Sequence, residues 1–539
     1  MPTSPRWLVC ACIAAASPAF GQQLAPSFAE LEAAGARIGT ISVDTHNIFD
    51  PGDPRERNFL FRAANQLHVK TKPWLIRRLL LFHTGDPVSV RVIDETERLI
   101  RMNSSVYDVD IYPVRYEDGV VDIEVRTRDT WTLQPGLKYR REGGVNSASF
   151  SLKETNLAGT GTTVGIERST SVDRTGTALQ LSHDHLFDGW TSVALEHTKF
   201  SDGMSESFAL NRPFYALETT WAATASASKF DRLDSLYQSG NNVAEYRHRG
   251  EAAELSGGWS RGLVGGWTHR YSAGLTHQAD SYELDPGHAP PPQLPANKTR
   301  TGPFLRYEAV EDDFMPVVNR DLIQRPEYLA MGWHPMLQLG RSLAVLGSTD
   351  QPWLMSASLS KGLRPYGSQQ LLTSASYSGQ YGSAGGDVRT VGASARYFAP
   401  QTGSFVLYLA GSMNRVKSPN IADELLLGGD SGLRGYPLRY QRGTHSALFT
   451  AEERFYTDWY VLRLFRVGAA VYYDVGRAWG SQLPNATNGW LHDVGFGLRI
   501  LNARASFGNV LHIDLAFPLH KSDPSVKSRQ LLVQTGKTF

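Results

Sequence analysis

Hydrophobic and polar residues alternate with a period of two through most of the chain after residue 130. Gly, Asn, Asp and Pro interrupt this alternation at short intervals, and helical spacing is rare there. Such a pattern predicts β-strands with one apolar and one polar face, joined by turns. The clearest segments are residues 191–200, 221–230, 354–359, 405–416, 467–479, 511–519 and 530–539.

The alternation predicts a mainly β fold in which residues 131–539 form a transmembrane antiparallel β-barrel. About 400 residues at roughly 25 per strand and connection give about sixteen strands, an even number of the kind that bacterial barrels use. A soluble β-sandwich would alternate in the same way. The many strands without a second domain break favour the barrel, as do aromatic residues near segment ends, which suit membrane interfaces. These aromatic residues are Trp190, Trp221, Trp459, Tyr460 and Trp479.

Residues 36–130 follow a different pattern. Residues 37–48 predict a strand, and a polar turn then leads to a helix with Thr71 as its N-cap and Pro73 in its first turn. A second helix follows Ser89, and residues 107–126 alternate around a glycine turn, which predicts a β-hairpin. The order β-α-α-β-β predicts one small α+β domain ahead of the barrel.

The first residues predict export from the cytoplasm. Arg6 precedes an apolar run over residues 7–16 that is too short to span a bilayer, and small residues follow at 19–21. We therefore interpret residues 1–21 as a signal peptide. Both cysteines, Cys10 and Cys12, lie within it, so the mature chain is expected to depend on neither disulfides nor a cysteine-ligated metal.

Charge and hydropathy narrow the classes of function. The formal net charge of +1 gives no basic field for a nucleic-acid partner. Mean hydropathy is −0.30, and no apolar run beyond the signal peptide is long enough for a transmembrane helix, which excludes an inner-membrane helix bundle. No phosphate-binding loop of the Walker type occurs, and no cofactor is expected. A periplasmic, secreted or outer-membrane β protein remains.

Two short motifs suggest catalytic or metal chemistry, but each lacks its partners. Residues 429–432 read Gly-Asp-Ser-Gly, like the nucleophile loop of serine proteases, yet nothing in the sequence places His445 or Asp474 beside Ser431. His183 and His185 share one face of a predicted strand, and no third metal ligand is implied. We predict neither catalytic nor metal-binding residues, and no enzyme.

A third pattern in the same region is more specific. Residues 467–479 alternate so that Asp474 and Gly476 fall on the face opposite the apolar one, which in a barrel is the lumen. The strand before them places Glu452 on its polar face. Arg434, in residues 428–442, could enter this lumen, because a guanidinium bridges carboxylates through paired donors.

The β-α-α-β-β order, with residues 85–87 reading Gly-Asp-Pro between the helices, resembles the POTRA (polypeptide-transport-associated) domain. This resemblance implies a periplasmic domain whose exposed strand edge pairs with an extended client chain.

The barrel motifs resemble the BamA/TamA (bacterial surface antigen) superfamily of outer-membrane assembly and translocation proteins. The resemblance rests on the tetrad Leu433, Arg434, Gly435 and Tyr436, on Asp474 and Gly476 in the following strand motif, and on Glu452. It implies that Arg434 locks an internal loop against Asp474 and Glu452. Residues 156–159 and 514–518 also look like this family, and Gln534, Gly536 and Phe539 resemble its C-terminal assembly signal.

The same resemblance implies a location in the outer membrane of a Gram-negative bacterium, with the N-terminal domain in the periplasm. The expected partners are the outer-membrane lipid bilayer, unfolded or nascent client proteins, and an accessory periplasmic or inner-membrane protein. The implied function is protein assembly or translocation, with strand insertion templated at a seam between the first and last barrel strands. The alternatives are a secretion pore for one specific partner protein, which usually carries two POTRA domains and a plug helix, and a passive porin.

Overall fold

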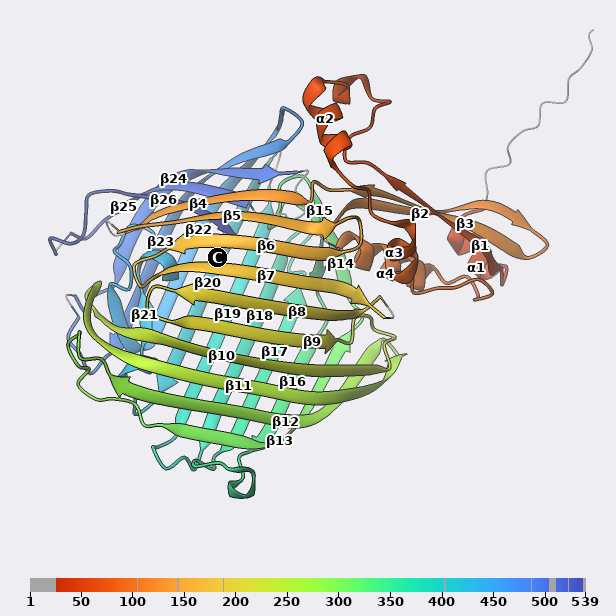
Figure 1. Cartoon of the computed structure of the whole chain (residues 1–539). Coiled ribbons are helices and arrows are strands. Elements are labelled where there is room, and N and C mark those ends of the chain that lie inside the picture. Colours follow the sequence, from red (N-terminus) through yellow and green to blue (C-terminus); the bar gives the residue numbers. More distant parts are fainter. Residues whose placement is uncertain are drawn as a thin grey trace, which may run out of the picture.

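The computed structural model describes residues 26–103, 105–142, 145–187, 189–401, 404–485, 487–503, 510–521 and 523–536. A small α+β domain lies at one end of a large closed β-barrel (Figure 1). We call this end of the barrel the domain end and the opposite one the far end. The predicted signal peptide, residues 1–21, lies outside the described residues.

The N-terminal domain contains a three-stranded sheet in the order β1-β3-β2, with β1 parallel and β2 antiparallel to β3. Apolar side chains of the sheet, among them Ile38, Val109 and Ile123, pack against Ile76 and Ile100 from two helices to form its core. Its elements are α1 (Phe28–Ala33), β1 (Arg37–His46), η1 (Pro54–Glu56), α2 (Phe59–Leu67), α3 (Pro73–Arg78), α4 (Val90–Arg101), β2 (Val106–Glu117) and β3 (Val120–Asp129). The order β-α-α-β-β is present, with η1 and α2 inserted after β1.

Two details of this domain differ from the sequence prediction. After the predicted polar turn and before Thr71 the chain forms α2, whose Phe61 and Ala64 pack in a separate small cluster. The N-cap of α3 is Lys72, without a side-chain cap, and Thr71 instead donates its backbone N–H to the Asp129 carboxylate at 2.7 Å. The contact of Thr71 with Asp129 therefore outweighs the local preference of threonine for the N-cap position.

The barrel wall consists of twenty strands in the described residues, each antiparallel to its neighbours where the register is described, and β26 lies next to β4 to close it. The wall strands are β4 (Leu133–Glu142), β5 (Val145–Leu157), β6 (Thr162–Thr170), β7 (Thr175–Leu186), β8 (Thr191–Phe200), β9 (Met204–Arg212), β10 (Trp221–Gln238), β11 (Asn241–Val264), β12 (Trp267–Leu284), β13 (Lys298–Glu311), β16 (His334–Arg341), β17 (Trp353–Leu363), β18 (Gln370–Tyr381), β19 (Val388–Pro400), β20 (Phe405–Lys417), β22 (Gln441–Val461), β23 (Phe465–Gly480), β24 (Leu491–Asn502), β25 (Val510–Pro518) and β26 (Gln530–Gly536). Three further short strands, β14 (Phe314–Val318), β15 (Pro326–Ala330) and β21 (Leu425–Leu427), and three short 3-10 helices, η2 (Ala344–Leu346), η3 (Ile421–Asp423) and η4 (Gly429–Ser431), lie in the connections.

The prediction of a mainly antiparallel β-barrel is confirmed, but the count of about sixteen strands was too low. The assumed spacing of about 25 residues was too long for β4 to β9, which have only 9 to 13 residues each. Some connections are also very short. Two residues, Ser239 and Gly240, join β10 to β11, and Gly265 and Gly266 join β11 to β12. All four have positive φ, as the tight turns of hairpins require.

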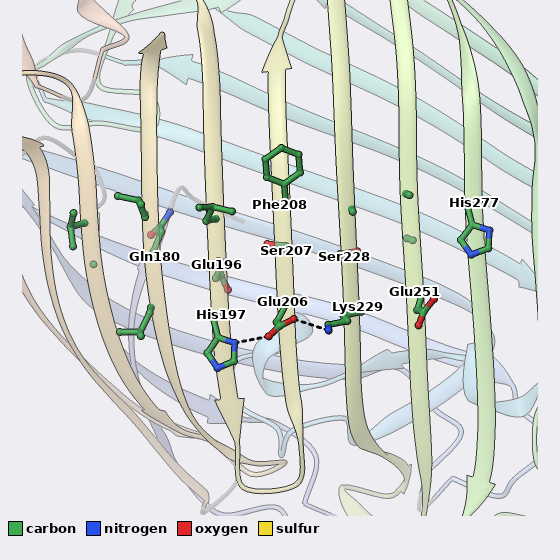
Figure 2. A pocket seen from close by; sticks show the side chains of 18 residues that line it. Gln180, Glu196, His197, Glu206, Ser207, Phe208, Ser228, Lys229, Glu251 and His277 are labelled. Atoms are coloured by element: carbon green, nitrogen blue, oxygen red, sulfur yellow. Dashed lines mark hydrogen bonds and ion pairs between the residues drawn. The ribbon is translucent and has the colours of Figure 1, made fainter.

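The outer face of the wall is apolar between two different rows of side chains. An aromatic row near the domain end places Trp221, Trp259, Tyr271 and Tyr307 next to one another across β10 to β13. A charged row crosses β8 to β11 nearer the far end, where Glu206 contacts His197 at 3.1 Å and Lys229 at 2.9 Å (Figure 2). Between the rows, the outward residues include Leu195, Phe208, Ala227, Leu255 and Leu275.

This band is somewhat shorter than the apolar band of about 25 Å that is typical of transmembrane barrels. Trp221 and Lys229 are eight residues apart on β10, which at about 3.3 Å per residue and a strand tilt of about 40° gives roughly 20 Å along the barrel axis. Trp190, which the sequence suggested for an aromatic girdle, instead packs against the core of the N-terminal domain. Among the described residues, no helix is both long and apolar enough to cross a membrane.

Candidate functional site

The connection between β20 and β22 enters the lumen from the far end and carries the predicted tetrad. It contains η3, β21 and η4, and its apolar residues form a buried cluster with the wall. The members of that cluster are Leu427, Leu433, Tyr436, Tyr440, Ala478, Leu491 and Val526. We call residues 418–440 the internal loop.

The backbone of the internal loop is specified by a few residues. Leu433 has φ of +56°, Gly432 has φ of +93°, and Gly428 has φ of +128°, a conformation that favours glycine. Gly435 packs so closely that an added Cβ would lie 2.7 Å from the Asp493 Cβ. The glycines thus let the loop turn sharply and press its tip against the wall.

Arg434 lies at the tip and is buried between two wall strands. Its Nε and Nη2 donate to the two carboxylate oxygens of Asp474 at 2.7 and 2.9 Å, and its Nη1 donates to Glu452 at 2.8 Å. The guanidinium also stacks 3.3 Å from the centre of the Tyr472 ring. The structure therefore brings together the arginine and both carboxylates that the sequence selected, in bidentate geometry with Asp474.

The other tetrad and strand-motif residues support this contact. Tyr436 donates its hydroxyl to the His492 carbonyl at 3.0 Å. Gly476 leaves room for the internal loop, because an added Cβ would lie 3.2 Å from Leu427 and 3.0 Å from the Ala447 carbonyl oxygen. The role of these residues as a lock stays a prediction.

The ionic cluster is larger than the sequence indicated. Glu452 also accepts from Arg454 Nε at 2.8 Å, and Arg499 donates to Asp514 at 2.6 Å. Arg434 Nη1 lies 3.6 Å from Asp514, whose side chain is fully buried. Asp514 belongs to residues 514–518, which the sequence had linked to the family only by their similarity. The alternation of residues along β25 was the signal that could have placed Asp514 in the lumen.

Two further arginines hold the internal loop and the first residues of β22 near the far end. Arg442 is buried and donates to Glu424 at 2.7 Å and to the Ile421 carbonyl at 2.7 Å. Arg439 donates to both oxygens of Asp173, in the turn between β6 and β7, at 3.0 and 2.8 Å. Sequence reasoning missed both anchors, because neither pair forms a local motif.

A hairpin of β14 and β15 occupies the lumen from the domain end. Its Ile323 packs in a buried cluster with Phe398 and Tyr408 of the wall, and the carbonyl of Arg320 accepts from Arg454 Nη1 at 3.0 Å. On its other side, Phe314 lies under the guanidinium of Arg98 in α4, at 4.5 Å. The hairpin thus connects the N-terminal domain to the ionic cluster.

The N-terminal domain is fixed to the first turns of the barrel. Asn156 donates to the Thr71 hydroxyl at 2.8 Å and accepts from the Gly161 N–H at 2.7 Å. The N–H of Leu217, between β9 and β10, donates to Glu95 of α4 at 2.9 Å. The turn at residues 156–159 therefore holds the N-terminal domain against the barrel.

The residues of the two rejected motifs are engaged elsewhere. Ser431 donates its hydroxyl to the Gly428 carbonyl at 3.1 Å, His445 stacks on Trp479, and Asp474 binds Arg434. His183 contacts Thr162, and His185 contacts Asn103. Within the described residues, no group of three or more His, Cys, Asp and Glu side chains has the arrangement of a metal site.

The C-terminal assembly signal is described only in part. Gln534 lies opposite His512 and Gly536 opposite Val510 in the pairing of β26 with β25. Phe539 lies outside the described residues.

Solved structures similar to this chain include the following three. BamA from Haemophilus ducreyi lacking POTRA domains 1–3 is 13% identical and matches 92% of this chain and 83% of that one, with a TM-score of 0.40. CdiB from Acinetobacter baumannii is 13% identical over 93% and 73% of the two chains, with a TM-score of 0.45. CdiB from Escherichia coli is 12% identical over 93% and 76%, with a TM-score of 0.49. No protein-family model and no curated protein matches the chain. At these identities the likeness concerns the fold and transfers no function.

Proposed function

We propose that this protein is an outer-membrane factor that inserts or translocates client proteins. Its N-terminal domain faces the periplasm and docks unfolded chains, and its barrel offers a seam between β26 and β4. The observation that carries the proposal is Arg434, buried against Asp474 and Glu452 at the tip of a loop that enters the lumen. A passive porin has no use for a buried ionic lock.

The outer wall supports the location. An apolar band of roughly 20 Å between an aromatic row and a charged row fits the hydrocarbon core of a bacterial outer membrane. Trp221 and Trp259 of the aromatic row are each about half exposed, as residues at a membrane interface are.

The ends of the barrel support the seam. β4 and β26 are the first and last strands of the wall, and they lie next to each other without a hairpin turn between them. A client strand can replace one of them by exchanging backbone hydrogen bonds alone, so this junction is the place where it is inserted. Such exchange needs neither a nucleotide nor covalent chemistry.

The sheet of the N-terminal domain supports docking of extended chains. In the described residues β2 pairs with β3 alone. On its other edge the Ile111 N–H and the Val109 carbonyl bind Glu97 and Arg101 of α4, so residues 114–117 are the part that offers backbone donors and acceptors. Val114 and Tyr116 on β2 are exposed at 51% and 38%. These positions are suitable for capturing a client.

Site-specific photo-crosslinking in cells tests the proposal. Crosslinkers at Val114, Tyr116, Leu531 and Phe539 are expected to trap nascent barrel chains. Leu339 on β16 is the matched control, because it is an outward leucine with 46% exposure, against 44% for Leu531, but lies far from the seam. Capture of one secreted partner would instead support export, and capture of nothing beyond the Leu339 background would support a porin.

A further inference from the structure

The insertion between β1 and α3 carries an apolar surface that no other described part of the chain covers. Phe59, Leu60 and Leu67 of α2 are exposed at 73%, 70% and 78%. At 100° per residue, these three side chains fall within an arc of about 100° on the helix. Large apolar side chains gathered on one exposed stripe mark an interaction surface.

The opposite face of α2 is fastened to the barrel. Phe61 is buried and stacks on Phe49 with ring centres 4.0 Å apart. Trp131, just before β4, and Leu464, in the turn between β22 and β23, pack against the same cluster. The orientation of the exposed stripe is therefore set by the barrel wall as well as by the N-terminal domain.

The turn that holds α2 continues the apolar outer wall of the barrel. Trp459, Val461 and Leu462 are exposed at 67%, 44% and 72%. Farther from the domain end, outward residues of the same two strands are also exposed, such as Val471 at 58%. In Figure 1, α2 stands apart from α1, α3 and α4, beside the barrel end where β4 begins. An apolar surface thus extends from the lipid-facing wall over the turn to α2.

The charges of the insertion suit an anionic surface. Arg57, Arg62 and Lys70 are exposed. Of the nearby acidic residues, Asp53 is paired with Arg55 at 3.1 Å, Asp50 lies 4.0 Å from Arg128, and Glu56 is buried. A short helix with an apolar stripe and basic neighbours is typical of segments that lie in the headgroup region of a bilayer.

We infer that α2 and the turn between β22 and β23 bind the phospholipid surface of the membrane leaflet at the domain end. This inference rests on the proposed membrane location of the barrel. The contact holds the N-terminal domain beside the seam, because Trp131 of the same cluster leads directly into β4. A client polypeptide on this surface is the competing occupant.

Single-cysteine labelling tests the inference, since both natural cysteines lie in the predicted signal peptide. Leu60→Cys and Leu67→Cys carry an environment-sensitive fluorophore in the full chain, inserted in liposomes of phosphatidylethanolamine and phosphatidylglycerol. Val114→Cys is the control, an exposed position on the β2–β3 hairpin, which points away from the barrel in Figure 1. We expect a blue shift at positions 60 and 67 and loss of emission when the lipids carry headgroup nitroxides, with neither change at 114.

Other outcomes would overturn the inference. Emission at positions 60 and 67 that matches position 114 in an inserted barrel would show that the stripe does not touch lipid. A blue shift that lipid nitroxides do not quench, appearing only when unfolded client is added, would assign the surface to the client. Insertion is checked separately by protease protection of the wall strands, so a barrel that fails to insert refutes the proposed location and not the contact of α2.

Discussion

Replacing Arg434 by alanine should release the tip of the internal loop from the lumen. The substitution removes three hydrogen bonds to carboxylates and the stacking on Tyr472. Asp474 and Glu452 stay buried, but they lose the positive charge of the Arg434 guanidinium. The anchors at Arg439 and Arg442 remain, so the loop should open at its tip and stay attached near the far end.

The size of the effect follows from burial. The side chains of Arg434, Asp474 and Glu452 are only 2%, 2% and 4% exposed, and removing one partner of such a buried pair costs about 3–5 kcal/mol. Arg454 contacts Glu452 and Thr450 donates to Asp474, so the lower end applies. A loss of about 3 kcal/mol raises the ratio of open to docked loop by roughly a hundredfold.

Two measurements follow the loop. In planar bilayers, Arg434→Ala should raise single-channel conductance, and in proteoliposomes it should expose residues 428–440 to added protease. Arg434→Lys keeps the charge but loses the paired donors, so we expect an intermediate effect. In an Asp474→Asn background, Arg434→Ala should cost less, because the carboxylate that it orphans is already neutral.

Arg442→Ala is the matched control, since Arg442 is equally buried in the same region and also binds a carboxylate, through one hydrogen bond to Glu424 at 2.7 Å. It should loosen the loop near the far end and leave the contacts of the tip intact. Unchanged conductance together with unchanged protease access in correctly folded Arg434→Ala protein would refute the lock.

The remaining predictions concern single contacts around this site. Gly435→Ala should destabilise the docked loop by about 1–3 kcal/mol through overpacking and raise its protease sensitivity, because its Cβ would meet Asp493 at 2.7 Å; equal sensitivity to the wild type would contradict this. Asn156→Ala removes two buried hydrogen bonds, about 1–3 kcal/mol, so amide exchange should quicken at residues 71–79 but not at 120–126. Ser431→Ala loses one bond to a loop carbonyl and should leave client insertion intact, and loss of a hydrolytic activity in this variant would revive the protease interpretation.

The barrel and the centre of the site could be predicted from the sequence because alternate residues of a strand face opposite sides of the sheet. Residues 191–200 coincide with β8, and the lumen face predicted for residues 467–479 is the one that contains Asp474 and Gly476. In a two-faced sheet each side chain has only two choices, so alternation assigns the face even without a known partner strand. Parity assigns Asp474 and Glu452 to the lumen face, whereas the contact of Arg434 with both was expected from the family resemblance.

The wider ionic cluster depends on register between strands, which parity does not provide. Asp514 reaches Arg499 because β24 and β25 pair in one particular register, in which Gly497 lies opposite Asp514. A shift by two residues would keep every side chain on its predicted face and still separate the pair. For the same reason, the local sequence pattern could not predict the contact of Arg439 with Asp173, 266 residues away.

The hairpin of β14 and β15 shows where alternation misleads. Its five-residue strands bury one face, as wall strands do, yet a membrane span needs about 9–11 residues, so length was the better criterion. Because its strands are too short for the wall, the hairpin buries its apolar side inside the lumen, against Phe398 and Tyr408. It places the carbonyl of Arg320 on Arg454, which binds the same Glu452 that holds Arg434. Glu452 therefore contacts Arg434 of the internal loop and also Arg454, which binds the hairpin. We predict that a movement of the N-terminal domain which displaces the hairpin disturbs Glu452 through Arg454.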